Sequence, residues 1–388
     1  MKKKLALSLV TFASLAFLAA CGNVSTSGGA AATGTEVSKD AVKFGLNFEE
    51  SGQTAAYGGA EQKAALLAIE EINAAGGVDG KKIEYKDYDN KSETAEATNI
   101  ATKLTTQDKV NVMIGPATST GTAAAASTAD KAGVPLVAPS ATQDDITKGH
   151  DFLYVAAFQD RFQGKILGKY ANDDLKLKKV ILYTDNGSDY AKGVAAAFRK
   201  SFKGEIVADE TFTTGDTDFQ AALTKFKGKD FDALVIPSYY TEAGKIVNQA
   251  RGMGIEQPIL GPDGLNGEDF VKQATAERAN KIYYVSGFAT KGDVSEKAKH
   301  FLEAFKAKYN EEPSMFAALA YDAVYMAADA AKGAKTSVDI SNNLAKLKDF
   351  EGVTGKMTIN KDHNTEKSAF MITMNNGQVD KVETVNPN

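Results

Sequence analysis

Cysteine and histidine are scarce in this chain. Among 388 residues there is one cysteine, Cys21, so a disulfide within the chain is excluded. The three histidines, His150, His300 and His363, lie far apart in the sequence, and no Cys/His set has the spacing of a zinc site. The chain also lacks a block of basic residues, and its formal net charge is −5. We therefore expect no metal, no cofactor and no nucleic-acid partner.

The motifs of four common enzyme classes are missing too. The sequence contains no GxxxxGK[ST], no GxGxxG after a strand, no HExxH and no GxSxG. The residues that follow its predicted strands are instead Ser, Thr, Tyr, Asp and Gly, which suit binding rather than catalysis. We therefore predict that the protein is not an enzyme. A Ser-Lys or paired-carboxylate enzyme, which needs no such motif, stays open as an alternative.

The first residues have the three regions of a secretory signal peptide. Three lysines at 2–4 precede an apolar run at 5–17, and small residues precede Cys21. The apolar run is shorter than the roughly 20 residues that a membrane-spanning helix needs. We therefore predict a signal peptide over residues 1–20.

The sequence Leu18-Ala19-Ala20-Cys21 also resembles a bacterial lipobox. The resemblance implies that Cys21 is lipidated, becomes the mature N-terminus and anchors the protein on the outer face of the bacterial cell membrane. An ordinary signal peptide with an incidental cysteine is the alternative. Residues 22–40 are rich in Gly, Ser, Thr and Ala, so we predict a flexible tether over 21–40.

From residue 41 onward, strand and helix patterns alternate, as in α/β proteins. A first series has predicted strands at 42–48, 82–88, 110–114 and 134–138, a loop at 49–59, and helices at about 60–75 and 93–106. The apolar stripe of the first helix consists of Ala65, Ala68, Ile69 and Ile72. A second series has predicted strands at 180–183, 206–212, 233–236, 259–260 and 281–286. Its predicted helices are at 161–172, after 190 to about 202, at 219–226 and at 242–252. Two such series argue for two parallel-sheet lobes.

The C-terminal part changes character. Helices are predicted at 296–309, 314–332 and 340–347, followed by strands at 356–359, 368–373 and 379–385. The sequence Asn375-Asn376-Gly377 predicts a hairpin turn between the last two strands. The length of 388 residues leaves room for two domains.

Two neighbouring strands of the first series end in small polar loops, at 115–120 and 139–142. In an open α/β sheet, ligands collect outside the carboxyl ends of strands. A helix that begins near Thr120 or Gly121 would add its positive end, which favours an anion such as a carboxylate. Serine and threonine also cap helices, and one such loop alone favours that interpretation. Two loops side by side favour a binding site.

Residues 41–385 resemble the periplasmic-type solute-binding proteins of branched-chain amino acid ABC transporters. The resemblance is carried by Gly58 with Ile72-Asn73-Ala74-Ala75-Gly76-Gly77, the Ile114-Gly115 loop, Pro139-Ser140-Ala141-Thr142 and Gly261-Pro262-Asp263-Gly264. It implies a two-lobed α/β fold of the type I periplasmic-binding-protein kind, each lobe a mostly parallel sheet flanked by helices, with a three-stranded hinge. Lobe 1 is expected at 41–159 plus 288–366, and lobe 2 at 160–287 plus 367–388. The ligand is expected between the lobes, which close over it.

The resemblance also implies which residues hold the charged groups of an amino acid. Ser119 matches a carboxylate-binding serine, and Thr142 matches a threonine that meets both charged groups. Ser140 matches a position that offers its backbone carbonyl to the ammonium. Asp263 stands where the family places an acid, commonly Glu, against the ammonium, and it is shorter by one methylene. A plain turn residue in Pro-Asp-Gly is the alternative for Asp263.

Aromatic residues are expected to surround the ligand side chain. The positions that match the family are Tyr57, Tyr190, Tyr239 and Phe316. Ordinary core aromatics are the alternative, most of all for Phe316, which lies at the start of a predicted helix. We choose Tyr239 over its neighbour Tyr240 because the alternation of a strand admits only one of them to the cleft.

These residues together predict the function. We expect a monomer that binds Leu, Ile and Val reversibly and delivers them to an ABC permease while anchored to the membrane through Cys21. The first alternative is the same fold with another ligand: an aliphatic amide, a small polar amino acid or a short peptide. The others are a sensory module that signals to a membrane partner, and an extracellular enzyme.

Overall fold

The computed structural model describes residues 33–292 and 294–385. The predicted signal peptide at 1–20 and the predicted lipidation site, Cys21, lie outside the described residues, as does part of the predicted tether. No helix within the described ranges combines the length and the apolar character needed to cross a membrane.

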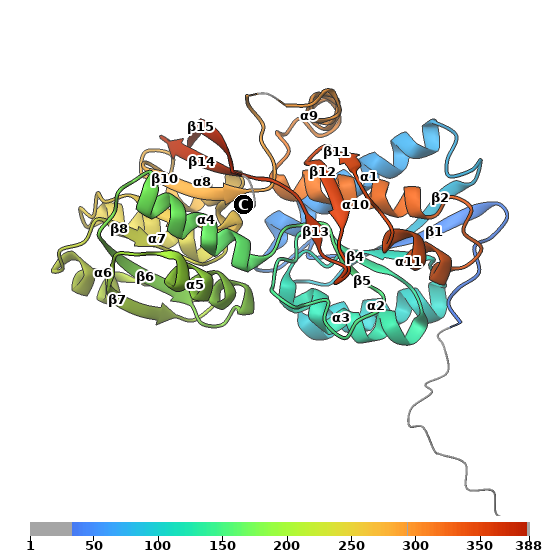
Figure 1. The fold of residues 1–388 in the computed structure, drawn as a ribbon, viewed down its shortest axis with the longest axis horizontal. Coiled ribbons are helices and arrows are strands. Elements are labelled where there is room, and N and C mark those ends of the chain that lie inside the picture. The colour runs from blue at the N-terminus through green and yellow to red at the C-terminus, as the bar shows by residue number, and fades with distance from the viewer. Residues whose placement is uncertain (1–32, 293, 386–388) are drawn as a thin grey trace, which may run out of the picture. The chain divides into compact units, whose positions relative to one another are not determined.

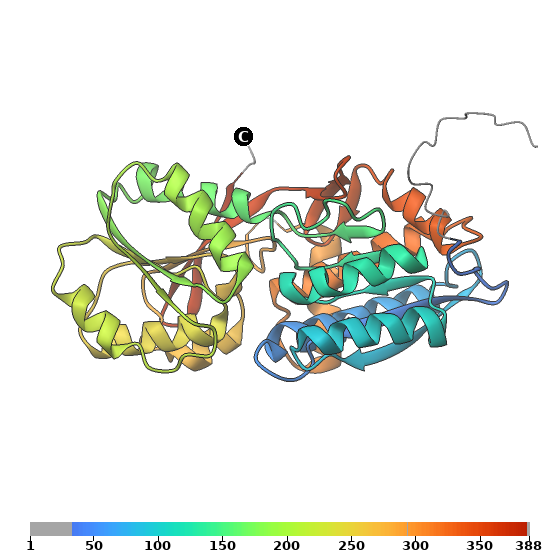
Figure 2. The ribbon, with the colours of Figure 1, turned by 90° about the horizontal axis from the view of Figure 1, so that it is seen from below.

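The first sheet has five parallel strands in the order β2-β1-β3-β4-β5 (Figure 1). They are β1 (Ala41–Phe48), β2 (Lys82–Asp89), β3 (Val112–Ile114), β4 (Leu136–Ala138) and β5 (Leu153–Val155). The apolar strands β1, β3 and β4 are almost fully buried, as expected where helices cover both faces of a parallel sheet. The covering helices include α1 (Ala55–Ala74), α2 (Thr94–Lys103), which η1 (Leu104–Asp108) continues, and α3 (Ser119–Ala132). Helices α2 and α3 pack side by side (Figure 2).

The second sheet has seven strands in the order β15-β14-β10-β9-β8-β6-β7. Five of them are parallel: β6 (Lys179–Asp185), β7 (Glu205–Phe212), β8 (Ala233–Val235), β9 (Ile259–Gly261) and β10 (Ile282–Ser286). The hairpin of β14 (Ala369–Asn375) and β15 (Gln378–Val385) adds antiparallel strands beside β10. Its turn residues, Asn376 and Gly377, have φ angles of 50° and 68°, so the predicted hairpin turn is confirmed. The helical segments are α4 (Asp160–Asp173), α5 (Asp189–Ser201), α6 (Gln220–Lys227), α7 (Tyr240–Gly252), η2 (Asp263–Leu265) and α8 (Glu268–Ala274).

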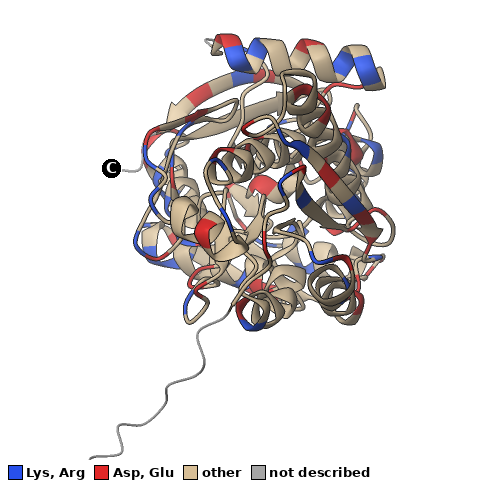
Figure 3. Cartoon of the chain, turned by 90° about the vertical axis from the view of Figure 1, so that its right-hand side faces the viewer, with Lys and Arg blue, Asp and Glu red and all other residues tan. Residues whose placement is uncertain are grey.

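Three further helices and a small sheet separate β10 from β14 along the chain. The helices are α9 (Glu296–Tyr309), α10 (Met315–Ala330) and α11 (Ser337–Leu344), and the antiparallel strands are β11 (Phe350–Gly352), β12 (Gly355–Ile359) and β13 (Thr365–Glu366). Helix α10 is buried along almost its whole length and packs against α1, β3 and β4. Basic and acidic residues are both spread over the outer elements, and α9 carries bands of each (Figure 3).

The chain passes three times between the part built on the first sheet and the part built on the second. The passages lie between β5 and α4, between β10 and α9, and between β13 and β14. The predicted two-lobed α/β fold with three crossings is therefore confirmed. The predicted lobe bounds, which divide the chain at 159/160, 287/288 and 366/367, remain a prediction.

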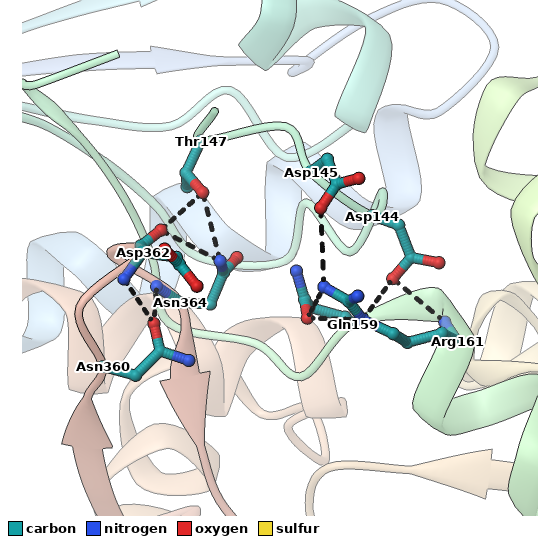
Figure 4. A network of polar contacts seen from close by, with 8 residues as sticks. All are labelled: Asp144, Asp145, Thr147, Gln159, Arg161, Asn360, Asp362 and Asn364. Carbon is teal, nitrogen blue, oxygen red and sulfur yellow. Dashed lines mark hydrogen bonds and ion pairs between the residues drawn. The ribbon is translucent and has the colours of Figure 1, made fainter. Parts of the chain in front are cut away.

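A polar network lies beside the first crossing (Figure 4). The guanidinium of Arg161, in the first turn of α4, pairs with Asp144 at 3.2 Å and Asp145 at 3.6 Å. Next to this group, the hydroxyl of Thr147 donates to the carbonyl of Asp362 at 2.6 Å, and the Asn364 amide donates to Thr147 at 3.1 Å. These bonds tie the loop after β4 to α4 and to the loop between β12 and β13.

Apart from small shifts at their ends, the observed elements differ from the predicted ones in two ways. The sequence patterns do not predict β5, α8, β11 or β13, which have between two and seven residues and so show little periodicity. The predicted loop at 49–59 is also too long, because α1 begins at Ala55. Adjacent glycines suggest a loop, but Gly58 lies within α1, where a Cβ atom would come within 2.4 Å of the Glu49 carbonyl oxygen. Gly58 thus lets the helix pack directly against the end of β1.

Candidate functional site

All eight residues that the sequence predicts as ligand contacts line one cavity. They are Tyr57, Ser119, Ser140, Thr142, Tyr190, Tyr239, Asp263 and Phe316, together with Ala117, Thr118 and Gly264. The space between the wall atoms, with its opening to solvent, is about 250 Å³, but the packed rings leave free room for about one water molecule. Its walls come from elements of both sheets, at the ends of β3, β4 and β9 and the start of α7. The structure thus brings the eight residues together, while their contacts with a ligand remain predictions.

Ser119 is the first residue of α3, one residue earlier than the predicted start of that helix. The side chain of Thr118 caps the helix and accepts a hydrogen bond from the Gly121 N–H at 3.2 Å. The Ser119 hydroxyl oxygen accepts from the backbone N–H groups of Thr142 and Gln143, each at 3.2 Å. Both bonds use oxygen lone pairs, so the hydroxyl proton of Ser119 remains available for a carboxylate. The N-terminus of α3 lies at the same place and favours an anion.

Ser140 and Thr142 lie in the loop after β4. The hydroxyl of Ser140 donates to the Ala117 carbonyl at 2.9 Å and also contacts the carboxyl of Glu61. Its side chain is therefore held by the protein, which leaves the backbone carbonyl as the group to meet a ligand. The carbonyl of Thr142 accepts from the N–H of Asp160 at 2.8 Å.

Asp263 is buried at the start of η2, directly after β9 and Pro262. Its carboxylate accepts a hydrogen bond of 2.6 Å from the Tyr190 hydroxyl, and its N–H donates to the side-chain oxygen of Gln163 at 2.9 Å. Burial raises the pKa of Asp263 to about 6, although the hydrogen bonds from Tyr190 and Gln163 oppose the rise. Asp263 also closes a turn, because its carbonyl accepts from the Asn266 N–H at 2.9 Å. The same residue is therefore both a turn residue and an acid on the cavity wall.

Four aromatic rings form the rest of the wall. Tyr57 stacks on Phe316 with 4.0 Å between ring centroids, and Tyr190 stacks on Tyr239 at 5.0 Å. Burial raises the pKa of the Tyr57 and Tyr190 hydroxyls well above the usual value, so both stay protonated. The Tyr57 hydroxyl donates to the Gly264 carbonyl at 2.6 Å, which joins the start of α1 to η2. Phe316 also belongs to the main hydrophobic core, so it is both a core residue and part of the cavity wall.

Tyr239 lines the cavity, but the alternation of a strand does not place it there. Strand β8 ends at Val235, and Tyr239 occupies the N-cap position directly before α7. Tyr240, the first residue of that helix, turns toward α1: its N–H donates to the Tyr57 hydroxyl at 3.0 Å, and its own hydroxyl accepts from the Ala56 N–H at 3.4 Å. The prediction that strand register decides between the two tyrosines is therefore wrong, because a helix N-terminus separates them.

Sequence reasoning missed three buried acids around the cavity. Glu49, at the end of β1, accepts hydrogen bonds from the N–H groups of Ala117 at 2.9 Å and Thr118 at 3.1 Å. Glu61 and Asp160 have no exposed surface, and burial raises the pKa of each carboxyl well above its usual value. One signal was available for Glu61, because it lies four residues before Ala65 on the apolar stripe of α1. A charged residue on such a stripe must be paired or neutral.

Within the described residues, no group of three or more His, Cys, Asp or Glu side chains is arranged to hold a metal ion. The cavity instead combines hydroxyls, a helix N-terminus, one acid of moderately raised pKa and aromatic rings. Chemically, this set can neutralise a carboxylate and an ammonium and enclose a small apolar side chain.

Comparisons with known proteins point in the same direction. The family described as periplasmic binding protein matches residues 41–378. The chain is similar to the branched-chain amino acid transporter substrate binding protein LivJ from Streptococcus pneumoniae, solved in complex with isoleucine, with 66% identity and a TM-score of 0.88 over 89% of this chain and 99% of that one. It is also similar to the leucine binding protein LivK from Thermotoga maritima, with 30% identity and a TM-score of 0.84 over 89% and 99% of the two chains. A leucine-, isoleucine-, valine-, threonine- and alanine-binding protein of Pseudomonas aeruginosa is 29% identical over 74% of this chain and 76% of its own length.

Proposed function

Because the chain belongs to the periplasmic binding protein family, we propose that it captures Leu, Ile and Val in the cavity and delivers them to an ABC permease. The observation that carries the proposal is that hydroxyls, an acid and aromatic rings from both sheets meet around one cavity. The isoleucine complex of the 66% identical LivJ supports the choice of ligand.

The ligand carboxylate binds at the start of α3. The Ser119 hydroxyl donates to it, and the partial positive charge of the helix N-terminus stabilises it. The ligand ammonium binds opposite, between the Asp263 carboxylate, the Ser140 carbonyl and the Thr142 hydroxyl. Pairing both charges matters because an unpaired buried charge is destabilising by several kcal/mol.

The ligand side chain lies against Tyr57, Tyr190, Tyr239 and Phe316. An aromatic wall gives no hydrogen bond to discriminate among aliphatic side chains, and one methylene changes the binding free energy by about 1–3 kcal/mol. Leu, Ile and Val should therefore all bind, with modest differences in affinity.

Binding requires movement, because the cavity has free room for only about one water molecule. Contacts that would have to separate include the bond from Tyr57 to Gly264 and a 2.6 Å bond from the amide of Gln53, in the loop after β1, to Glu242 of α7. The proposed cycle is therefore opening of the lobes, entry of the amino acid and closure over it.

Calorimetry on protein that has been unfolded, freed of carried-over ligand and refolded tests the proposal. Leu, Ile and Val should each release heat and saturate one site. Threonine, which has a hydroxyl in place of one methyl group of valine, should bind about 10–100-fold more weakly than valine. Acetamide, serine and a dipeptide represent the alternative ligands. Saturation by one of these, with no heat from Leu, Ile or Val, would overturn the proposal.

The protein is extracytoplasmic, as members of this family are. The anchor is the proposed lipid on Cys21, and the working form is a monomer. Mass spectrometry of the mature N-terminus tests the lipid, and light scattering of the purified protein tests the monomer. The proposed role involves no chemical change, so isoleucine recovered after binding should be unaltered by mass.

A further inference from the structure

Glu61 is a buried acid that contacts the loop after β4 and has no charged partner of opposite sign among the described residues. It is the seventh residue of α1 and has no exposed surface. One carboxyl oxygen contacts the Ser140 hydroxyl, and the other has no hydrogen-bond partner. In the part of the chain that the structure describes, no ion pair includes Glu61.

The contacts of Ser140 fix where the protons lie. A serine hydroxyl has one proton, and the Ser140 oxygen lies 2.9 Å from the Ala117 carbonyl, which can only accept. The Ser140 hydroxyl therefore donates its single proton to the Ala117 carbonyl. The close contact between Ser140 and Glu61 then needs a proton from Glu61. An ionised Glu61 would leave the hydroxyl facing two acceptors with a single proton.

The surrounding charges agree with a neutral Glu61. Burial favours the protonated form and is the main cause of the raised pKa of Glu61. The nearby negative charge of Glu49 adds to the rise, and the contact with Ser140 opposes it. Four titratable groups of the elements packed against α1 have partners other than Glu61. On α10, Tyr321 and Tyr325 bond to Glu71 and Asp322 bonds to Thr354, while on β2 Asp87 accepts from Gln62.

We propose that Glu61 is a neutral positioning residue that donates its carboxyl proton to Ser140 and so fixes the loop that presents the Ser140 carbonyl to the ligand ammonium. This inference rests on the proposed function. The bond from Ser140 to Ala117 extends the same support to the loop that leads into α3 and Ser119. A protonated acid supplies a donor at this place without adding a buried negative charge near the ligand carboxylate.

The matched variants are E61Q, whose amide can donate to Ser140, and E61A, which has no donor. We expect the isoleucine affinity of E61Q to lie within about threefold of wild type, and that of E61A to fall about tenfold or more. The affinity of E61Q should also follow the same pH profile as wild type around neutral pH, because the proposal keeps Glu61 protonated there and the amide that replaces it carries no titratable proton. Infrared difference spectra between wild type and E61Q should contain the band of a protonated carboxyl at neutral pH.

Equal losses of affinity in E61Q and E61A, or a carboxylate band in place of the protonated one, would overturn the inference. If E61A does not fold, S140A removes the bond to Glu61 together with the bond to Ala117, without a large cavity, and should show the tenfold loss that E61Q does not. The proposed function is judged separately by wild type. If wild type binds no branched-chain amino acid, that function fails, whereas the infrared band still decides the protonation of Glu61.

Discussion

The hydroxyl of Tyr190, on α5, donates a 2.6 Å hydrogen bond to the carboxylate of Asp263, which follows β9. The same hydroxyl oxygen accepts from the N–H of Gly264 at 2.8 Å. Tyr190 therefore fixes both the side chain and the backbone of the turn that holds the cavity's acid. The two residues have different proposed roles, since only Asp263 carries the charge that meets the ligand.

Asp263→Ala should weaken isoleucine binding far more than Tyr190→Phe. The first change leaves a buried ammonium without its partner, a loss of about 3–5 kcal/mol. The second removes the hydrogen bond to the Asp263 carboxylate and the acceptor of the Gly264 N–H but leaves the acid in place, a loss of about 1.5–3 kcal/mol. Calorimetry with both variants measures the difference, and circular dichroism checks that both are folded. Equal losses would mean that the ammonium lies elsewhere in the cavity.

Isoleucine binding should weaken as the pH falls through about 6. Burial raises the pKa of Asp263 to about 6 in the free protein, and a bound ammonium favours the ionised form and lowers the pKa again. Below pH 6 the ligand must therefore displace a proton, and the affinity should fall by up to about tenfold per pH unit. Above that value the affinity should stay level. Calorimetry in two buffers of different ionisation enthalpy detects the released proton, and Asp263→Asn should abolish this dependence.

Gly58→Ala should destabilise the protein, whereas Gly59→Ala should not. A Cβ atom at Gly58 would lie 2.4 Å from the backbone oxygen of Glu49, and at Gly59 it would meet nothing within 4 Å. We expect Gly58→Ala to lower the free energy of unfolding by about 1–3 kcal/mol, because the start of α1 must move away from β1. Gly59→Ala lies in the same helix and should raise it by up to about 1 kcal/mol. Denaturant unfolding compares the two, and similar results would show that the close approach is easily relieved.

Asp322→Ala should be strongly destabilising. The buried carboxylate of Asp322 accepts from the N–H groups of Val353 at 2.7 Å and Thr354 at 2.9 Å, and Thr354 in turn contacts the buried amine of Lys367. Removing the acid leaves these donors unpaired, with an expected loss of about 3–5 kcal/mol in the free energy of unfolding.

The control for this variant is Asp329→Ala on the same helix. Asp329 is exposed and pairs with the exposed Lys332, so its removal should change stability by less than about 0.5 kcal/mol. A small effect of Asp322→Ala in denaturant unfolding would mean that water or a shifted loop replaces the lost acceptor.

The sequence predicts most of the fold because the longer helices and strands have clear periodic patterns of apolar residues. The apolar runs of β1 and β6 and the stripe of α1 leave little choice of element, while β5 and β13 are too short to form a pattern. The loops that contain Ser119 and Thr142 were predicted because parallel strands bring their carboxyl ends to one edge, whereas the choice of these two residues rested on the family resemblance. The meeting of Tyr57 with Gly264 joins residues from different sheets, and periodicity along the chain carries no information about such a contact.

The buried acids show a second limit of sequence reasoning. Glu61 and Asp160 belong to residue types that usually lie at the surface. Their raised pKa values follow from burial, which only the structure shows. Tyr239 shows a third limit. It was selected by strand alternation but owes its position to the N-terminus of α7, so the right residue followed from the wrong local geometry.

The ring cluster around the cavity also makes the protein its own optical reporter. The chain has 14 tyrosines and no tryptophan, so ultraviolet fluorescence above the phenylalanine range comes from tyrosine alone. Tyr190 and Tyr239 stack with centroids 5.0 Å apart, and Tyr57 meets Tyr239 edge-on at 5.6 Å. A ligand that separates these rings would change the tyrosine fluorescence directly, so its binding can be followed in solution without attaching a dye.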